Sequence, residues 1–398
     1  MVSSEQRQMR LSDSLNRLGT ETAFDVLARA KQLEAEGRRI IHLGIGAPDF
    51  DTADHIKEAC AKALRDGHTA YCPAPGIPEL REACAAYLSR SRQIPVDPAR
   101  VVVTTGAKPF LGYAVMATCD PGDEVIYPNP GFPIYESVIR YFGATPVPLP
   151  LSEEREFALT AEDLAARMSP RTRLVILNSP ANPTGGVIES GEMAGVAEVL
   201  GASDAWILSD EVYSEMVYDG SHDSIARYGD LAERTILLDG FSKTFAMTGW
   251  RLGYAALPEP LVEPITRLII NTVSCTPPAM QLAGVAALEG PWDGVRSMVE
   301  EFRRRRDVVV VGLNDLPGVS CVMPRGAFYA FPNVSGTGVA ARELASLSLE
   351  RAGVAVVSGT SFGEYGEGYL RVSYANSVEN IEAGLAALRE LLEAELSS

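Results

Sequence analysis

The chain has 398 residues, of which 46% are hydrophobic and 22% charged, and its 35 basic and 52 acidic residues give a formal net charge of −17. This length exceeds one ordinary core, so we expect two or three domains, and the acidic balance argues against nucleic acid or an anionic membrane as partner. No apolar run approaches the roughly 18 to 20 residues that cross a bilayer, and the N-terminus lacks the apolar core of a secretory signal.

The six cysteines and four histidines are scattered along the chain without any C-x-x-C pair. This spacing predicts neither a zinc site nor another metal cluster. It is typical of reduced, structural thiols, so we expect a cytoplasmic protein without a metal.

The first predicted element is an amphipathic helix over residues 21–36, which Gly37 would end. Its apolar residues recur at helical spacing, at Phe24, Leu27, Ala30 and Leu33. From about residue 100, short runs rich in Val, Ile and Leu alternate with helical stretches, which predicts a parallel or mixed sheet covered on both faces. The predicted strands are 101–104, 124–127, 173–177, 205–209 and 235–238. After about residue 290, a helix predicted over 295–313, strand-like pieces and a final helix indicate a separate α/β lobe.

Four candidate functional residues follow these predicted strands: Gly106, Asn182, Asp210 and Lys243. Open α/β sheets bind ligands outside the carboxyl ends of their strands. We therefore expect these residues to meet at one edge of the sheet, a convergence that core packing alone does not predict.

Lys243 lies in the segment GFSKTFAMTGWRLG, residues 240–253. A lysine is usually a solvated surface charge, but this one has aromatic and apolar neighbours in sequence. Such a setting lowers the pKa of the amine and makes it a nucleophile for carbonyl compounds. Arg251 is suited to hold a phosphate, with the hydroxyl of Ser242 as a second donor.

Asp210 lies in the segment AWILSDEVY, residues 205–213, directly after the predicted strand 205–209. In isolation it could equally be a strand-end or helix-cap carboxylate. The functional interpretation is an anion that faces a ring nitrogen and keeps it protonated, which makes a pyridine ring an electron sink. Tyr213 could reach the phenolic oxygen of such a cofactor, although a lone tyrosine there is more often a core residue.

Three further segments carry weaker signals. Asn182 lies in a turn rich in Pro and Gly after a strand and could donate its amide to the same phenolic oxygen. Residues 104–112 run from a strand into a helix, whose N-terminal amides favour phosphate, and Lys108 could contribute only its backbone there. Arg371 interrupts an apolar strand. Pointing inward, it would clamp a carboxylate with two hydrogen bonds.

Together these segments resemble the class I and II aminotransferases, a pyridoxal-phosphate family of fold type I, and within it the prokaryotic aspartate aminotransferase-like branch. The similarity runs from about residue 20 to the end and is strongest over residues 240–253. Its other motifs follow in the family's order, namely GAPDFD at 46–51, YCPAPGIPELR at 71–81, NPTG at 182–185, DEVY at 210–213 and the strand with Arg371.

The resemblance implies an α/β fold with a large cofactor-binding domain, residues 48–290, whose mostly parallel sheet is flanked by helices. Residues 1–47 and 291–398 would form a smaller α/β domain with an N-terminal arm. It also implies a pyridoxal 5′-phosphate-dependent aminotransferase that exchanges the amino group of an L-amino acid with a 2-oxo acid by a ping-pong mechanism. Tyr71 would reach the phosphate of a neighbouring subunit, so a homodimer with shared active sites is expected.

The resemblance further assigns roles to single residues. Lys243 would carry the cofactor as a Schiff base and then move the proton of the substrate, while Asp210 would pair with the ring nitrogen. Tyr213 and Asn182 would hold the phenolic oxygen, and Phe132 would stack on the ring. The phosphate would be enclosed by Gly106, Ala107, Lys108, Ser242 and Arg251. The substrate carboxylate would be bound by Arg371, Gly46 and Asn182.

Two departures from the family pattern narrow what it implies. Gly240 stands where many relatives have serine, so one phosphate hydroxyl is absent. No residue is identified that would bind a carboxylate on the substrate side chain. Lys108 is the nearest basic candidate for that role.

The motifs leave a second enzyme class open, because relatives that eliminate, replace or cyclise substituents, or react with oxygen, need the same residues. A third class, a regulator with an aminotransferase-like domain, would carry a DNA-binding domain at its N-terminus. Here the enzyme-like pattern begins within about 20 residues and the net charge is −17, which argues against such a regulator.

Overall fold

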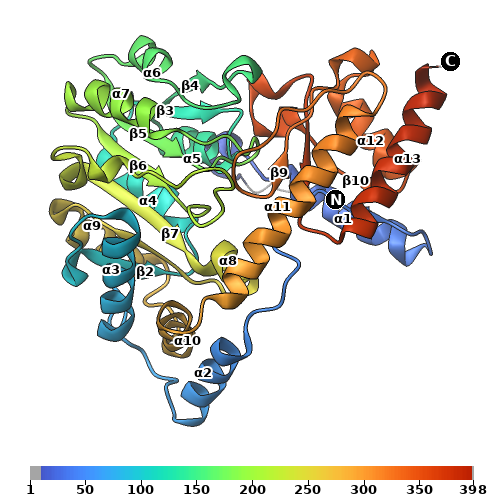
Figure 1. The fold of residues 1–398 in the computed structure, drawn as a ribbon. Helices are drawn as coiled ribbons and strands as arrows, with labels where there is room; N and C mark the ends of the chain where they lie inside the picture. Colours follow the sequence, from blue (N-terminus) through green and yellow to red (C-terminus); the bar gives the residue numbers. More distant parts are fainter. Residues whose placement is uncertain (1–9, 397–398) are drawn as a thin grey trace, which may run out of the picture.

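The computed structural model describes residues 10–396 and shows an α/β fold with a large sheet and a smaller lobe (Figure 1). The seven-stranded sheet has the order β2-β8-β7-β6-β5-β3-β4. Its strands are β2 (Val101–Thr104), β3 (Glu124–Asn129), β4 (Thr145–Pro150), β5 (Thr172–Asn178), β6 (Trp206–Asp210), β7 (Thr235–Gly240) and β8 (Gly253–Ala256). Neighbouring strands are parallel except at β8, which pairs antiparallel with β2 and β7. The predicted fold class is confirmed.

All five predicted strands are present, but the sequence analysis missed β4 and β8. The segment of β4 is TPVPLP, and its three prolines argue against a strand because proline cannot donate a ladder hydrogen bond. The strand tolerates them because it lies at the edge of the sheet and pairs only with β3. The segment of β8, GYAA, is too short and too poor in branched residues to stand out.

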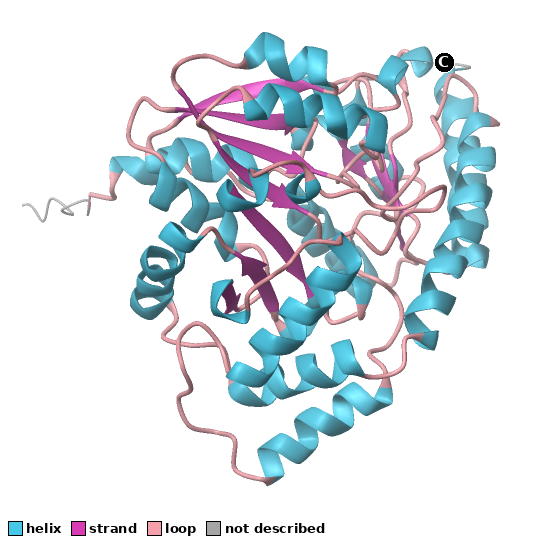
Figure 2. Cartoon of the chain, turned by 60° about the vertical axis from the view of Figure 1, so that its left-hand side comes forward, coloured by secondary structure: helices cyan, strands magenta, loops and turns pink. Residues whose placement is uncertain are grey.

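Helices cover both faces of the large sheet, as Figure 2 shows. Successive side chains of a strand point to opposite faces, and on one face Val102, Ile176 and Leu208 pack in a single core with the helices above them. The helices of that face are α4 (Pro109–Thr118), α5 (Ile134–Phe142) and α9 (Glu259–Thr272). The other face is covered by α3 (Pro78–Arg92), α6 (Ala161–Arg167), α7 (Ser190–Gly201) and α10 (Pro278–Glu289), and α2 (Asp54–Arg65) packs on the outside of α10.

The smaller lobe is built around the long helix α11 (Asp293–Asn314) and a three-stranded antiparallel sheet of order β11-β12-β9. Its other elements are β9 (Tyr329–Ala330), α12 (Ala341–Glu350), β10 (Val354–Ala355), β11 (Val357–Ser358), β12 (Leu370–Ser373) and α13 (Val378–Leu396). The N-terminal segment joins this lobe, because β1 (Ile41–His42) pairs in parallel with β10. Such pairing is what the predicted domain division requires, although the boundaries at 48 and 290 stay a prediction.

The N-terminal helix α1 spans Thr22–Ala35, close to the predicted range. Its predicted apolar face is wrong at one end, because Phe24 is 58% exposed while Ala30 and Leu33 are buried. Phe24 instead lies at the rim of a pocket described below. Within residues 10–396, no helix is long and apolar enough to cross a membrane.

Candidate active site

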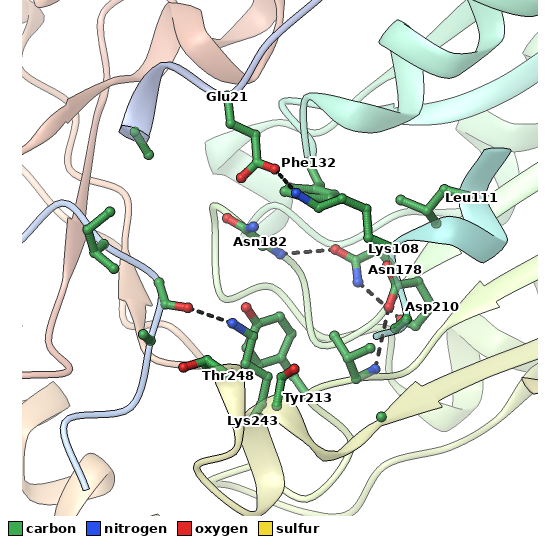
Figure 3. A pocket seen from close by; sticks show the side chains of 18 of the residues that line it. Glu21, Lys108, Leu111, Phe132, Asn178, Asn182, Asp210, Tyr213, Lys243 and Thr248 are labelled. Atoms are coloured by element: carbon green, nitrogen blue, oxygen red, sulfur yellow. Dashed lines mark hydrogen bonds and ion pairs between the residues drawn. The ribbon is translucent and has the colours of Figure 1, made fainter. Parts of the chain in front are cut away.

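A cavity of about 500 Å³ opens at the carboxyl ends of β5, β6 and β7, between the large sheet and the smaller lobe. Figure 3 shows side chains from distant parts of the sequence pointing into it. Eleven predicted site residues line the cavity: Gly46, Ala107, Lys108, Phe132, Asn182, Asp210, Tyr213, Ser242, Lys243, Arg251 and Arg371. Of the four residues expected to meet at this edge of the sheet, Asn182, Asp210 and Lys243 line the cavity, and Gly106 lies behind Arg251.

Lys243 lies on the short helix α8 (Phe241–Thr244), directly after β7. Its Nζ donates a hydrogen bond of 2.5 Å to the backbone oxygen of Gly46. Burial of the amine lowers the pKa of Lys243 to about 8, and the nearby guanidinium of Arg371 acts in the same direction. A larger share of the amine is therefore neutral, and so nucleophilic, at neutral pH than for an exposed lysine.

Asp210 is the last residue of β6, and its side chain is buried. Its Oδ2 accepts a 2.7 Å hydrogen bond from the hydroxyl of Tyr135, while the amide of Val212 lies 3.5 Å from Oδ1. Burial raises the pKa of Asp210 to about 6, against the opposing effect of the Tyr135 hydrogen bond. Within residues 10–396, no cation forms a salt bridge with this carboxylate. The charge of Asp210 is thus poorly compensated by the protein.

Arg371 on β12 points inward and is only 4% exposed, which is the orientation that a carboxylate clamp requires. Its Nη1 donates to Oδ1 of Asn182 at 3.0 Å, and its Nη2 donates to the backbone oxygen of Gly44. The guanidinium carbon lies 4.7 Å from the ring centres of both Tyr329 and Phe362. Its Nε is buried without a partner among the described residues. A buried donor left unpaired is costly, which points to a ligand that completes it.

Asn182 is held in place by Asn178, the last residue of β5. The Asn178 Oδ1 accepts from the backbone amide of Asn182 at 3.0 Å, and its Nδ2 donates to the backbone oxygen of Asp210 at 3.1 Å. One amide side chain therefore fixes the turn after β5 to the end of β6.

The start of α4 and the guanidinium of Arg251 form a second part of the cavity wall. Gly106 has a φ of +88°, and a Cβ at this position would collide with the guanidinium of Arg251. Arg251 in turn donates from Nη1 to the backbone oxygen of Thr248 at 2.9 Å. The backbone amides of Ala107 and Lys108, which lie just before α4, suit an anion such as phosphate together with Ser242 and Arg251.

Lys108 behaves differently from the expectation that it contributes only its backbone. Its ammonium group forms an ion pair with Glu21, just before α1, and lies 5.4 Å from the ring centre of Phe132 (Figure 3). The sequence analysis did not identify Glu21 or Phe24, which both line the cavity. Nothing in their spacing distinguishes them from other residues of an amphipathic helix and its start.

Tyr135, Tyr329 and Asn178 also line the cavity and are not predicted from the sequence. The hydroxyl groups of Tyr213 and Tyr329 share a 2.7 Å hydrogen bond, and a Cβ on Gly46 would collide with the hydroxyl of Tyr329. These contacts join segments far apart in sequence, so no local pattern could reveal them. Two predicted residues lie outside the cavity lining, namely Gly106, which backs Arg251, and Tyr71, which is 88% exposed.

Comparison with known proteins covers almost the whole chain. The family model described as aminotransferase class I and II matches residues 38–388. The probable aspartate/prephenate aminotransferase of Aquifex aeolicus is 41% identical, with 96% of this chain and 98% of that protein covered. Aromatic-amino-acid aminotransferase 2 of Thermococcus litoralis is 40% identical, with 97% and 99% covered.

Among solved structures, the aspartate aminotransferase from Rhizobium meliloti has a TM-score of 0.92 at 36% identity, covering 97% of this chain and 99% of that one. The aspartate aminotransferase from Thermus thermophilus with maleate has a TM-score of 0.91 at 35% identity, covering 96% and 100%. The similarity thus extends through both the large sheet and the smaller lobe.

Proposed function

The chain belongs to the class I and II aminotransferases and is a pyridoxal-phosphate-dependent aminotransferase, and from this premise we propose that its catalytic site is the cavity around Lys243. There it would exchange the amino group of an L-amino acid with a 2-oxo acid by a ping-pong mechanism. The observation that carries the proposal is the meeting of an amine of lowered pKa, a buried uncompensated carboxylate and a buried guanidinium with one unpaired nitrogen.

The cavity fits the cofactor in size and in charge. Its volume of about 500 Å³ lies within the range of small-molecule sites. Asp210 offers a buried carboxylate without a cation, which suits a protonated ring nitrogen. The space in front of Arg251, which a side chain at position 106 would fill, suits a phosphate.

When bound, pyridoxal phosphate supplies an aldehyde carbon that takes up the amino group and a protonated ring that withdraws electrons from the substrate. We assign the ring nitrogen to Asp210 and one face of the ring to Phe132. The phenolic oxygen is assigned to Tyr213 and to the amide nitrogen of Asn182, since the amide oxygen already accepts from Arg371. The phosphate is assigned to Ser242, Arg251 and the backbone of Gly106, Ala107 and Lys108.

Lys243 would hold the cofactor through its amine and would then serve as the proton carrier. An amine with a pKa of about 8 can accept the proton from the substrate Cα and return it at neutral pH. The backbone oxygen of Gly46 holds the amine toward the smaller lobe, where Arg371 also lies. The proton carrier and the carboxylate clamp are therefore on the same side of the cavity.

Arg371 binds the α-carboxylate shared by amino acid and oxo acid. Its planar guanidinium can donate two parallel hydrogen bonds to a carboxylate, which a lysine cannot do. The rings of Tyr329 and Phe362 pack against the guanidinium and keep water from it. The contact with Asn182 sets its orientation.

The remaining wall is mixed in character and would face the substrate side chain. Ile45, Leu111 and Phe24 are apolar, whereas Lys108 is a cation already paired with Glu21. Relatives are named for aspartate, for aromatic amino acids and for aspartate with prephenate. We propose that this chain accepts acidic or aromatic amino acids, and both belong in the assay.

We also propose a homodimer with shared active sites that works in the cytoplasm. Tyr71 is 88% exposed and does not line the cavity of its own chain, so the role that the resemblance assigns to it requires a second copy. All six cysteines are free thiols, which favours a reducing compartment.

The proposal is tested by incubating the purified holoenzyme with single amino acids, with and without 2-oxoglutarate or pyruvate. We expect the cofactor absorbance to change on addition of the amino donor, and a new amino acid to form only when the oxo acid is present. A Lys243→Ala variant, as matched control, should form none. Release of ammonia or peroxide, or a rearranged carbon skeleton without an acceptor, would point instead to an elimination, oxidation or cyclisation reaction.

A further inference from the structure

Tyr135 contacts the carboxylate of Asp210 from the side of the sheet that carries α5. It is fully buried, and its hydroxyl donates to Oδ2 of Asp210 at 2.7 Å. The ring of Phe132 packs edge-on against it, with centres 5.7 Å apart. Among the described residues, Tyr135 is the only side chain that donates a hydrogen bond to this carboxylate. Oδ1 accepts no side-chain hydrogen bond from the described residues and only the 3.5 Å contact from the amide of Val212, so it is the oxygen with more room for a ligand.

The other groups around Asp210 do little to stabilise its charge. Glu211, the residue directly after β6, opposes ionisation, while Lys243 on α8 favours it only weakly. Tyr213 lies nearby, and Asn178 on β5 donates to the backbone oxygen rather than to the carboxylate. Burial holds the pKa of Asp210 at about 6 even with the Tyr135 hydrogen bond in place. Without this bond, the carboxylate would become protonated at higher pH.

We propose that Tyr135 is a positioning residue that keeps Asp210 ionised at neutral pH and directs its Oδ1 toward the ring nitrogen of the cofactor. The inference rests on the proposed role of Asp210. Tyr135 is suited to this task because burial, together with the charge of Asp210, raises the pKa of its hydroxyl well above the ordinary value. The phenol therefore remains a donor throughout the range in which Asp210 titrates.

The test is the dissociation constant of pyridoxal phosphate as a function of pH. Full-length wild-type protein and Tyr135→Phe are dialysed against graded cofactor concentrations from pH 5.5 to 8.5, and bound cofactor is measured by absorbance. Because the bound cofactor requires ionised Asp210, affinity falls as pH drops below the pKa of this group. A higher pKa in Tyr135→Phe moves this fall to higher pH. We expect the ratio of the two constants to be near one at pH 8.5 and to rise to about tenfold below pH 6.

A matched control is Tyr113→Phe. Tyr113 is buried in the same core, and its hydroxyl shares a 2.5 Å hydrogen bond with Thr272, away from Asp210. Its ratio to wild type should stay near one at every pH. A ratio for Tyr135→Phe that is flat across the pH range, at any size, would overturn the proposal, because lost packing has no reason to follow the titration of Asp210.

Asp210→Asn separates this inference from the proposed function on which it rests. Its ratio to wild type should fall as the pH drops, the opposite trend, because the wild type loses the carboxylate charge that the variant never has. In the Asp210→Asn background, Tyr135→Phe should add no pH-dependent change. If Asp210→Asn binds cofactor like the wild type at all pH values, the role of Asp210 itself is wrong.

A second substitution keeps the test decisive if Tyr135→Phe does not fold. Incorporation of 3-fluorotyrosine at position 135 alone retains the shape of the ring and makes its hydroxyl a stronger donor. Affinity should then exceed that of the wild type below pH 6 and match it at pH 8.5. An unchanged or uniformly weakened affinity would contradict the role of Tyr135.

Discussion

Asp210 and Glu211 are consecutive residues with buried carboxylates, but their hydrogen-bond partners differ and their pKa values shift in opposite directions. Glu211 accepts hydrogen bonds from Arg92 at 2.8 Å, Ser209 at 2.8 Å and Ser224 at 2.6 Å. Burial alone would raise the pKa of Glu211, but the charge of His222 and then that of Arg92 outweigh it and lower the pKa to about 2. Burial raises the pKa of Asp210, by contrast, to about 6.

The difference follows from partners and not from burial, because both side chains are almost inaccessible. Arg92, the last residue of α3, also binds Asp239 at 2.7 Å and Ser214 at 2.7 Å, so the carboxylate of Glu211 lies in a network of protein partners. Burial nevertheless raises the pKa of Asp239 to about 7, against the opposing charge of Arg92. Arg371 keeps a buried Nε without a partner among the described residues, and Asp210 has no arginine or lysine in salt-bridge contact within that part of the chain. We infer that the cluster around Arg92 stabilises the fold, whereas the charged groups of Asp210 and Arg371 bind ligands in the cavity.

Removing a cation from the satisfied cluster should give the largest loss of stability. Arg92→Met leaves Glu211 and Asp239 buried without their shared cation, at a cost of about 3–5 kcal/mol in the free energy of unfolding. Urea unfolding of the cofactor-free protein measures this loss. Arg81→Met on the same helix is the control, because among residues 10–396 its guanidinium donates to no side chain and only to the backbone oxygens of Val101 and Ala99. Equal losses in the two variants would contradict the assignment.

Arg371→Lys should instead affect substrate binding. A point charge cannot reproduce the two-pronged contact, so we expect KM for amino acid and oxo acid to rise roughly 10- to 100-fold. The dissociation constant of the cofactor should stay near that of the wild type, because Arg371 is not assigned to it. Steady-state kinetics with both substrates measures the effect. A change in cofactor affinity without a change in KM would place Arg371 in the wrong part of the cavity.

Asp210→Asn should reveal the smallest effect, through the pH dependence of stability. The pKa of Asp210 in the folded protein is about 6, above its ordinary value of 3.8, so folded wild type holds the proton more tightly than the unfolded chain. The wild type therefore loses stability as pH rises toward 6. Relative to it, cofactor-free Asp210→Asn should gain about 1.4 kcal/mol between pH 5 and 7.5.

Glu211→Gln is the counterpart to that experiment. Because the pKa of Glu211 is lowered to about 2, its contribution to stability is present above pH 4.5 and is lost only as the pH falls toward 2. Lowering the pH from 4.5 toward 3 should therefore destabilise the wild type relative to Glu211→Gln, whereas it should not destabilise the wild type relative to Asp210→Asn. If the free energy of unfolding of the Asp210 and Glu211 variants, each relative to the wild type, changed with pH in the same way, the proposed difference between the two carboxylates would be wrong.

Local signals explain how far the sequence could predict this molecule. Strands β6 and β7 each contain a short apolar run, WIL and ILL, that marks them in the sequence. Asp210 ends β6 and Lys243 follows β7, at the edge where α/β sheets bind ligands. Tyr135 and Tyr329 could not be predicted, because their hydroxyl groups contact residues far away in the sequence. Tyr135 contacts Asp210, 75 positions later, and Tyr329 contacts Tyr213, 116 positions earlier. Such long-range contacts arise from packing and leave no periodic pattern.

The difference between Asp210 and Glu211 was equally hidden. Neighbouring residues at a strand end look alike in the sequence, and only the structure shows that one meets Arg92 and the other Tyr135. Partners contributed by distant helices therefore decide which buried charge belongs to the fold and which to the cavity.

The central claim, that Lys243 carries the cofactor, is tested most directly by borohydride reduction of the holoenzyme followed by digestion and mass spectrometry. Reduction makes the bond between cofactor and lysine permanent, so the modified residue can be located. We expect one cofactor-bearing peptide, modified at Lys243, and none from Lys243→Ala treated in the same way. A cofactor adduct at another lysine such as Lys108, or an adduct that persists in Lys243→Ala, would contradict the account.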